Sequence, residues 1–124
     1  LYNTAQQSVA NGADLALGTN VINSAGSIAA SGTTGVTLAP GQYLVTFVTD
    51  AAVTGEGTLG AALALDGTEL PYAATAKTLT AAGADRIALT AIVAPTAAGT
   101  LTVRNNTGST DTYQNSTLSV IKLA

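Results

Sequence analysis

Apolar and polar positions along the chain follow the two-residue alternation of β-strands and nowhere hold the spacing of a helix. Short runs rich in Val, Thr, Leu and Ile are separated by Gly, Asn, Asp and Pro, which favour turns. Strands recurring at intervals of about eight to twelve residues are typical of a sandwich or barrel and not of βαβ units. The expected strand segments are 15–17, 21–22, 27–31, 33–39, 42–53, 59–65, 68–74, 85–94, 99–105 and 116–124.

The clearest turn signal is the pair Asp66-Gly67, which separates two apolar runs. Both residue types tolerate the positive φ angles of a primed turn, so the pair predicts a two-residue hairpin. Pro71 cannot donate a ladder hydrogen bond, and it limits the segment 68–74 to a sheet edge or a bulge. The segment 75–85 is expected to be a loop or an edge strand, because its Thr and Gly residues disfavour a helical turn.

The segment 42–53 is unusual because it is largely apolar on both of its faces. Alternation divides it into two sets of side chains. The sets are Tyr43, Val45 and Phe47 on one face and Leu44, Thr46 and Val48 on the other. Such a strand belongs where both faces of a sheet are covered.

Composition favours self-association. The 124 residues are expected to form a single domain spanning residues 1–124. Only 9% of them are charged, whereas roughly 25% is typical of a soluble domain. With so few charges the chain is expected to cover its surface with Thr, Ser, Asn and Gly and to hide part of it against copies of itself. The four basic residues are scattered, which disfavours nucleic-acid binding, and no apolar run is long enough to span a membrane.

The residue inventory argues against catalysis. Without His or Cys the chain cannot build a Ser-His-Asp triad or a Cys-His pair, and it lacks the usual zinc ligands. The seven acidic residues are scattered and are interpreted as turn or solubilising residues, so no catalytic residue, metal site or cofactor is expected. A structural calcium ion held by carboxylate and carbonyl oxygens of the loops is the alternative. The N-x-S/T patterns at Asn105 and Asn115 are interpreted as incidental. Tyr72 and Tyr113 lie in turn-like surroundings and are candidate ligand contacts, with a half-buried structural role as the alternative.

Four segments carry a family resemblance that covers nearly the whole chain. They are the strand "PGQYLVTF", the hairpin "LALDGTELP", the segment "GTLTVRNNTG" and the terminal "SVIKLA". Together they resemble the C-terminal globular domain of bacterial collagen-like spore-surface (exosporium) glycoproteins of the BclA type. The resemblance implies a homotrimeric jelly roll of about ten short strands, with the fold of tumour necrosis factor and complement heads.

In such a trimer one face of the inner sheet packs in the protomer and the other faces the three-fold axis. The resemblance therefore assigns two groups of residues. The expected monomer core includes Tyr43, Val45, Phe47, Leu63 and Leu65. The expected trimer interface includes Leu44, Thr46, Val48, Ile121 and Leu123, together with Leu89 or Ala88. A monomeric sandwich whose loop covers the second face is the alternative.

The function that the resemblance implies is structural. The domain would trimerise, set the register of a collagen-like stalk expected before Leu1, and form the tip of an extracellular filament on the spore surface. The alternative is an adhesin-like module that recognises a host protein or glycan through its tip loops. A phage tail-fibre head is a further trimeric β candidate, and an enzyme is the least favoured.

Overall fold

The structure is a computed structural model that describes residues 1–19 and 26–124. These residues form strands, turns and loops and contain no helix, so none of them lies in a helix that could cross a membrane. The ten strands are β1 (Tyr2–Asn3), β2 (Gln7–Val9), β3 (Ile28–Ser31), β4 (Gly35–Leu38), β5 (Tyr43–Val53), β6 (Gly57–Leu65), β7 (Thr68–Leu79), β8 (Gly83–Val93), β9 (Gly99–Arg104) and β10 (Asp111–Lys122). The strand expected at 21–22 lies outside the described residues.

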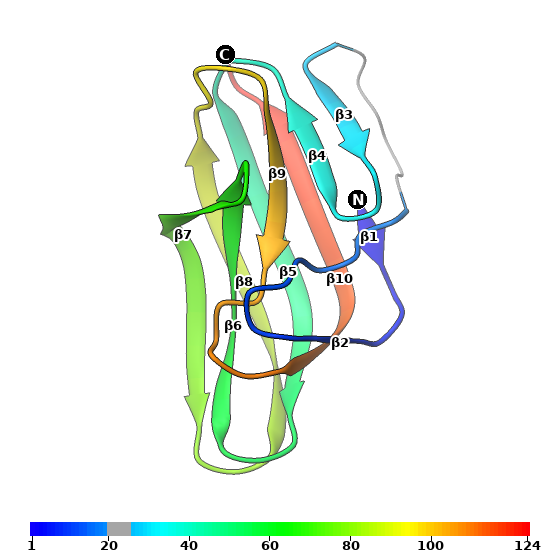
Figure 1. The fold of residues 1–124 in the computed structure, drawn as a ribbon, viewed down its shortest axis with the longest axis vertical. Helices are drawn as coiled ribbons and strands as arrows, with labels where there is room; N and C mark the ends of the chain where they lie inside the picture. The colour runs from blue at the N-terminus through cyan, green and yellow to red at the C-terminus, as the bar shows by residue number, and fades with distance from the viewer. Residues whose placement is uncertain (20–25) are drawn as a thin grey trace.

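The strands form two five-stranded antiparallel sheets (Figure 1). One sheet has the order β1-β10-β5-β8, with β2 also paired to β10, and the other has the order β3-β4-β9-β6-β7. The chain passes between the sheets at β2 to β3, β4 to β5, β5 to β6, β7 to β8, β8 to β9 and β9 to β10. This interleaving is the strand order of a jelly roll. The predicted all-β jelly-roll sandwich is therefore confirmed.

The hairpin at Asp66-Gly67 has the predicted form. Asp66 and Gly67 have φ angles of 52° and 80° and connect β6 to β7. Pro71 lies on β7, which is the edge strand of its sheet, and the register with β6 shifts between Ala62 and Ala64. β7 runs to Leu79 and the edge strand β8 begins at Gly83, so the segment 75–85 consists of two pieces of edge strand, 75–79 and 83–85, joined by residues 80–82.

The segment 15–17 is not a regular strand, contrary to the prediction. It is held by two separate backbone hydrogen bonds, from Leu15 to the Val103 carbonyl and from Leu17 to the Thr33 carbonyl. These partners belong to different parts of the chain, so no continuous ladder forms. The apolar pattern nevertheless reflects burial, because both leucine side chains are fully buried.

The core lies between the two sheets and is closed within one chain. Tyr43, Val45, Phe47 and Leu63 are fully buried, whereas Leu65 is partly buried at the margin of the core. The accessible surface is 5985 Å², close to the roughly 6,000 Å² expected of a compact monomer of this mass. One copy of the chain therefore buries its own core. Any further apolar side chains must lie on the outer side of a sheet.

Candidate interaction face

The side of the β10-β5-β8 sheet that points away from the core is here called the outward face. Burial alternates strictly along β5, with the odd-numbered side chains inside and the even-numbered ones half-exposed. Directly paired residues on antiparallel strands share a face. The register of β5 with β8 and β10 therefore shows which residues of β8 and β10 also lie on the outward face. The residues so placed are Leu44, Thr46, Val48, Asp50, Arg86, Ala88, Thr90, Ile92, Thr117, Ser119 and Ile121.

One end of the outward face is apolar. Leu44 lies opposite Ile92 on one side and Ile121 on the other. Ile92 and Ile121 are 56% and 59% exposed, and Leu123, which follows β10, is 51% exposed. In the described part of the chain four large apolar side chains are this exposed, and Tyr72 is the fourth. Among the described residues, three of the four most exposed large apolar side chains thus lie at or just beyond this end of one sheet.

The middle of the outward face is small and uncharged. Thr46 is flanked by Thr90 and Ser119. The next row holds Val48, with Ala88 and Thr117 on its two sides. Side chains of this size leave the sheet surface open to close approach by another backbone or sheet.

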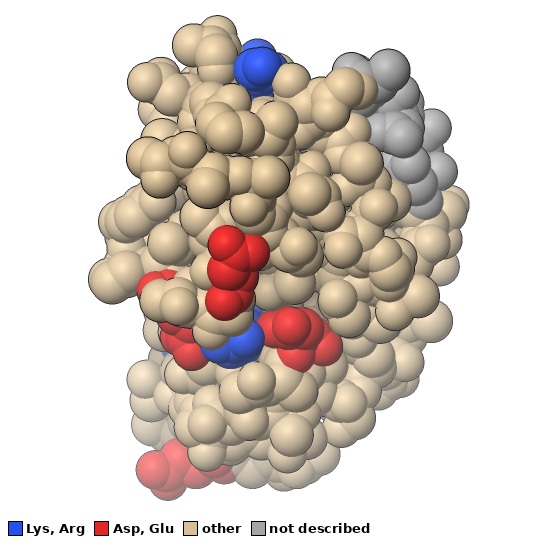
Figure 2. All heavy atoms as spheres, turned by 45° about the horizontal axis from the view of Figure 1, so that its top comes forward, with Lys and Arg blue, Asp and Glu red and all other residues tan. Residues whose placement is uncertain are grey.

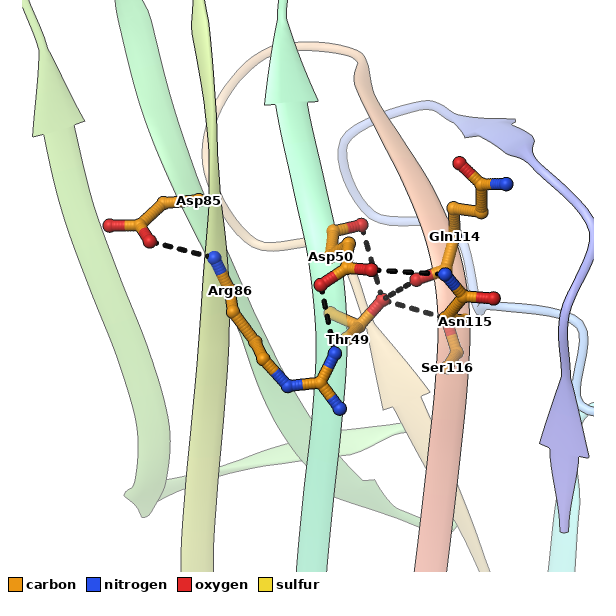
Figure 3. Close-up of polar contacts among 7 residues, drawn as sticks. All are labelled: Thr49, Asp50, Asp85, Arg86, Gln114, Asn115 and Ser116. Atoms are coloured by element: carbon orange, nitrogen blue, oxygen red, sulfur yellow. Dashed lines mark hydrogen bonds and ion pairs between the residues drawn. The ribbon is translucent and has the colours of Figure 1, made fainter.

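The other end of the outward face carries a charge pair (Figure 3). Arg86 donates a hydrogen bond to Asp50 Oδ1 at 2.9 Å, and the Asn115 amide donates to Asp50 Oδ2 at 3.0 Å. The Asn115 hydrogen bond and, after it, the Arg86 guanidinium lower the pKa of Asp50. The carboxylate is therefore ionised and matched by a cation from the same chain, which leaves this end without net charge.

A bulge in β10 places Asn115 beside Asp50. The register with β5 shifts between Gln114 and Thr117, and Asn115 has a φ of +53°. Behind it the buried Thr49 hydroxyl lies 2.8 Å from the Ser116 hydroxyl and donates to the Gln114 carbonyl at 3.2 Å. These contacts fix the bulge from the inner side of the sheet, so the position of Asn115 is set by the fold (Figure 3).

The predicted interface residues divide into two groups. Leu44, Thr46, Val48 and Ile121 lie on the outward face, and Leu123 is exposed just beyond it. Leu89 is a correction, because it is opposite the core residue Phe47 and only 6% exposed. Its neighbour Ala88, the other residue considered, is outward.

Ile92 is the large apolar residue of the outward face that the sequence prediction missed. Counting by twos from Ala88 along β8 gives Thr90 and then Ile92. The alternation rule would therefore have found it once Ala88, and not Leu89, was taken as outward.

The two candidate ligand tyrosines belong to different sheets. Tyr113 is a second correction, because its ring is fully buried and its hydroxyl donates to the Gly60 carbonyl at 2.6 Å. Tyr72 is 61% exposed on the edge strand β7. The structure therefore leaves Tyr72 as a single exposed aromatic side chain, away from the outward face.

Charge is also sparse on the face of the molecule that Figure 2 draws. Figure 2 shows a mostly uncharged surface on which acidic side chains gather around one basic side chain. The ion pair between Arg104 and Asp14 spans 3.3 Å, and Arg104 also donates to the Gly67 carbonyl at 2.8 Å. No group of three or more acidic side chains that could hold a metal ion occurs in residues 1–19 and 26–124.

Comparison with known proteins yields one distant structural similarity. No protein-family model and no curated protein matches the chain. Among solved structures the chain is similar to one described as "Carbohydrate-Binding Module CBM36 in complex with calcium and xylotriose", with 18% identity, a TM-score of 0.39, and coverage of 93% of this chain and 99% of that one. At this TM-score the likeness carries no argument, and the jelly-roll assignment rests on the strand order.

Proposed function

We propose that the protein is a non-catalytic assembly domain that forms a homotrimer through the outward face. The observation that carries the proposal is the exposure of Ile92, Ile121 and Leu123 around Leu44 on a protomer whose core is already complete. Apolar surface removed from water stabilises an assembly by about 25 cal/mol per Å². Burial of the apolar end against another copy is thus expected to stabilise the assembly more than burial of the rest of the outward face.

The rest of the outward face is compatible with contact between identical copies. Its middle residues are small and neutral, and Asp50 and Arg86 compensate each other within one chain. Like faces can therefore approach one another without net repulsion between charges of the same sign.

The biological setting of the proposal rests on the sequence resemblance. The "PGQYLVTF" and "SVIKLA" segments support a trimeric tip at the end of a collagen-like filament on a bacterial spore surface. Both segments belong to the strands that build the outward face, β5 and β10. The trimer would set the register of the stalk, and the protein would perform no chemistry.

Sedimentation velocity at micromolar protein concentration tests the assembly. We expect the wild type to sediment at three times the 12.1 kDa protomer mass. Ile121→Asp, which places a charge in the apolar end, is expected to sediment as a folded monomer with an unchanged circular dichroism spectrum. Thr37→Asp is the matched control, because Thr37 is an exposed strand residue of the other sheet. A monomeric wild type at this concentration overturns the proposal.

A second candidate function is recognition of a host protein or glycan, and the exposure of Tyr72 favours it. An exposed aromatic ring on an edge strand offers both an apolar surface and a hydroxyl to a ligand. A binding screen of wild type and Tyr72→Ala against glycans and matrix proteins tests this function. Binding that Tyr72→Ala abolishes supports it, and silence of the wild type across the screen refutes it.

A further inference from the structure

The loop between β9 and β10 brings four oxygen-bearing side chains together at the start of β10. They alternate along the sequence as Asn105, Thr107, Ser109 and Asp111. The Thr107 hydroxyl lies 2.8 Å from Asn105 Oδ1 and 3.4 Å from Asp111 Oδ1. The Ser109 hydroxyl also lies 3.4 Å from Asp111 Oδ1.

Asp111 is the charged member of this cluster, and no cation pairs with it. It is 1% exposed, and its Oδ2 atom has no hydrogen-bond partner. The three ion pairs of the described residues use other carboxylates, namely those of Asp85, Asp50 and Asp14. A buried polar atom without a partner carries a large desolvation cost, and a buried charge a larger one.

The charge of Asp111 is met by hydrogen bonds alone. The Thr107 and Ser109 hydroxyls lie 3.4 Å from Oδ1, and the Gly60 backbone donates a further hydrogen bond to the carboxyl group. No Lys or Arg of the described residues forms an ion pair with it. A bound cation would therefore supply the kind of partner that this carboxylate lacks.

We propose that the loop 105–111 binds a calcium ion, with Asp111 as the charged ligand and the Thr107, Ser109 and Asn105 side-chain oxygens as neutral ligands. Ca²⁺ takes six to eight oxygen ligands in flexible geometry, and known calcium loops also use alternate residues. The exposed residues Asn106, Gly108 and Thr110 give solvent access to the loop, so water can complete the shell. A single carboxylate implies weak binding, in the range of about 10⁻⁴–10⁻³ M that extracellular modules show.

Calcium at this position would join three parts of the fold. The Asn105 amide already donates to the Val9 carbonyl at 2.8 Å, and the Gly108 amide donates to Asn11 Oδ1 at 2.8 Å. An ion on Asp111 would hold the loop to the first residue of β10 while these bonds hold it to the N-terminal segment.

Thermal unfolding of chelator-treated protein tests the proposal, with calcium and magnesium chloride as the probes. At ten times the dissociation constant a bound ion is expected to raise the wild-type Tm by about 3–6 °C. Magnesium is expected to raise it less, because it demands compact octahedral geometry. Asp111→Asn removes the charged ligand and is expected to abolish the calcium shift. Glu56→Gln, at an exposed turn between β5 and β6, is the matched control and is expected to keep the shift.

The proposal is overturned by a wild-type Tm that calcium leaves unchanged, by an equal shift in Asp111→Asn, or by loss of the shift in Glu56→Gln. Terbium luminescence provides a readout that needs no variant. Terbium at Asp111 would lie two residues from Tyr113 and is expected to emit when tyrosine is excited, and calcium is expected to quench this emission by competition. Absence of sensitised emission from folded wild-type protein also overturns the proposal.

Discussion

Leu44 on β5 lies directly opposite Ile121 on β10, with both side chains on the solvent side of the sheet. Leu44 is partly buried and Ile121 is 59% exposed. One residue further along β5, Val45 is fully buried in the core. The same strand therefore supplies the interior of the protomer and an apolar surface that the protomer leaves uncovered.

This arrangement predicts that truncating Leu44 weakens self-association, whereas truncating Leu89 weakens the folded protomer. Leu44→Ala removes interface contacts and is expected to weaken self-association by about 10- to 100-fold, with little change in protomer stability. Leu89→Ala leaves a cavity beside Phe47 and is expected to lower the free energy of unfolding by about 2–5 kcal/mol. Sedimentation equilibrium measures the first effect and urea unfolding of dilute protein the second. If Leu89→Ala dissociated the assembly without lowering the stability of the protomer, Leu89 would have to be an interface residue after all.

Local patterns predicted the features that depend on neighbouring residues. Alternation separated Tyr43, Val45 and Phe47 from the side chains between them, and Asp66-Gly67 marked a real hairpin. These features follow from backbone geometry within a few residues.

Features set by partners distant in sequence could not be predicted in this way. Tyr113 is buried because its hydroxyl reaches Gly60, more than fifty residues away in the chain, and the sequence around it looks like a turn. The face of Leu89 depends on the register of β8 with β5, which a single strand does not reveal. The partnerless Oδ2 atom of Asp111 is likewise visible only once the sheets are assembled.

The buried Tyr113 hydroxyl predicts a measurable loss on its removal. Tyr113→Phe keeps the ring but leaves the Gly60 carbonyl without this donor, so it is expected to lower the free energy of unfolding by about 1–3 kcal/mol. Tyr72→Phe removes the same atom from an exposed ring and is expected to change it by less than about 0.5 kcal/mol. Urea unfolding monitored by circular dichroism compares the two. Equal effects would mean that the hydrogen bond to Gly60 contributes nothing.

Asn105 joins the β9–β10 loop to the N-terminal segment and predicts a larger loss. It is fully buried, donates to the Val9 and Ser109 carbonyls, and accepts hydrogen bonds from the Thr107 amide and hydroxyl. Asn105→Ala leaves these groups unpaired and is expected to lower the free energy of unfolding by more than about 3 kcal/mol.

The exposed neighbour Asn106 supplies the control for this substitution. Asn106→Ala is expected to be neutral within about 0.5 kcal/mol in the same unfolding experiment. The burial of Asn105 also predicts that its N-x-T pattern carries no glycan on the folded protein, which mass spectrometry of intact protein checks. Full stability of Asn105→Ala would contradict the role of Asn105 as the link between the two segments.

The cluster at the polar end of the outward face predicts a pH dependence. The hydrogen bond from Asn115 and the contact with Arg86 lower the pKa of Asp50 in the folded protein, whereas an unfolded Asp has a pKa of about 3.9. A depressed folded pKa contributes stability above the unfolded value, and that stability is lost as the pH falls through the folded pKa. The stability gap between wild type and Asp50→Asn is therefore expected to be present above about pH 5 and to close toward pH 2.

Asn115→Gly tests which partner of Asp50 matters more. Glycine accepts the φ of +53° at this position, so the bulge is expected to remain while the amide donor is lost. The Asn115 hydrogen bond is the largest single cause of the lowered pKa of Asp50, ahead of the hydrogen bond from Arg86 and the charge of Arg86. Asn115→Gly is therefore expected to raise that pKa, and Arg86→Gln provides the comparison. Carboxyl-carbon NMR titration of the two variants gives both values. A larger rise in Arg86→Gln would show that the ion pair, and not the bulge in β10, controls the charge on this face.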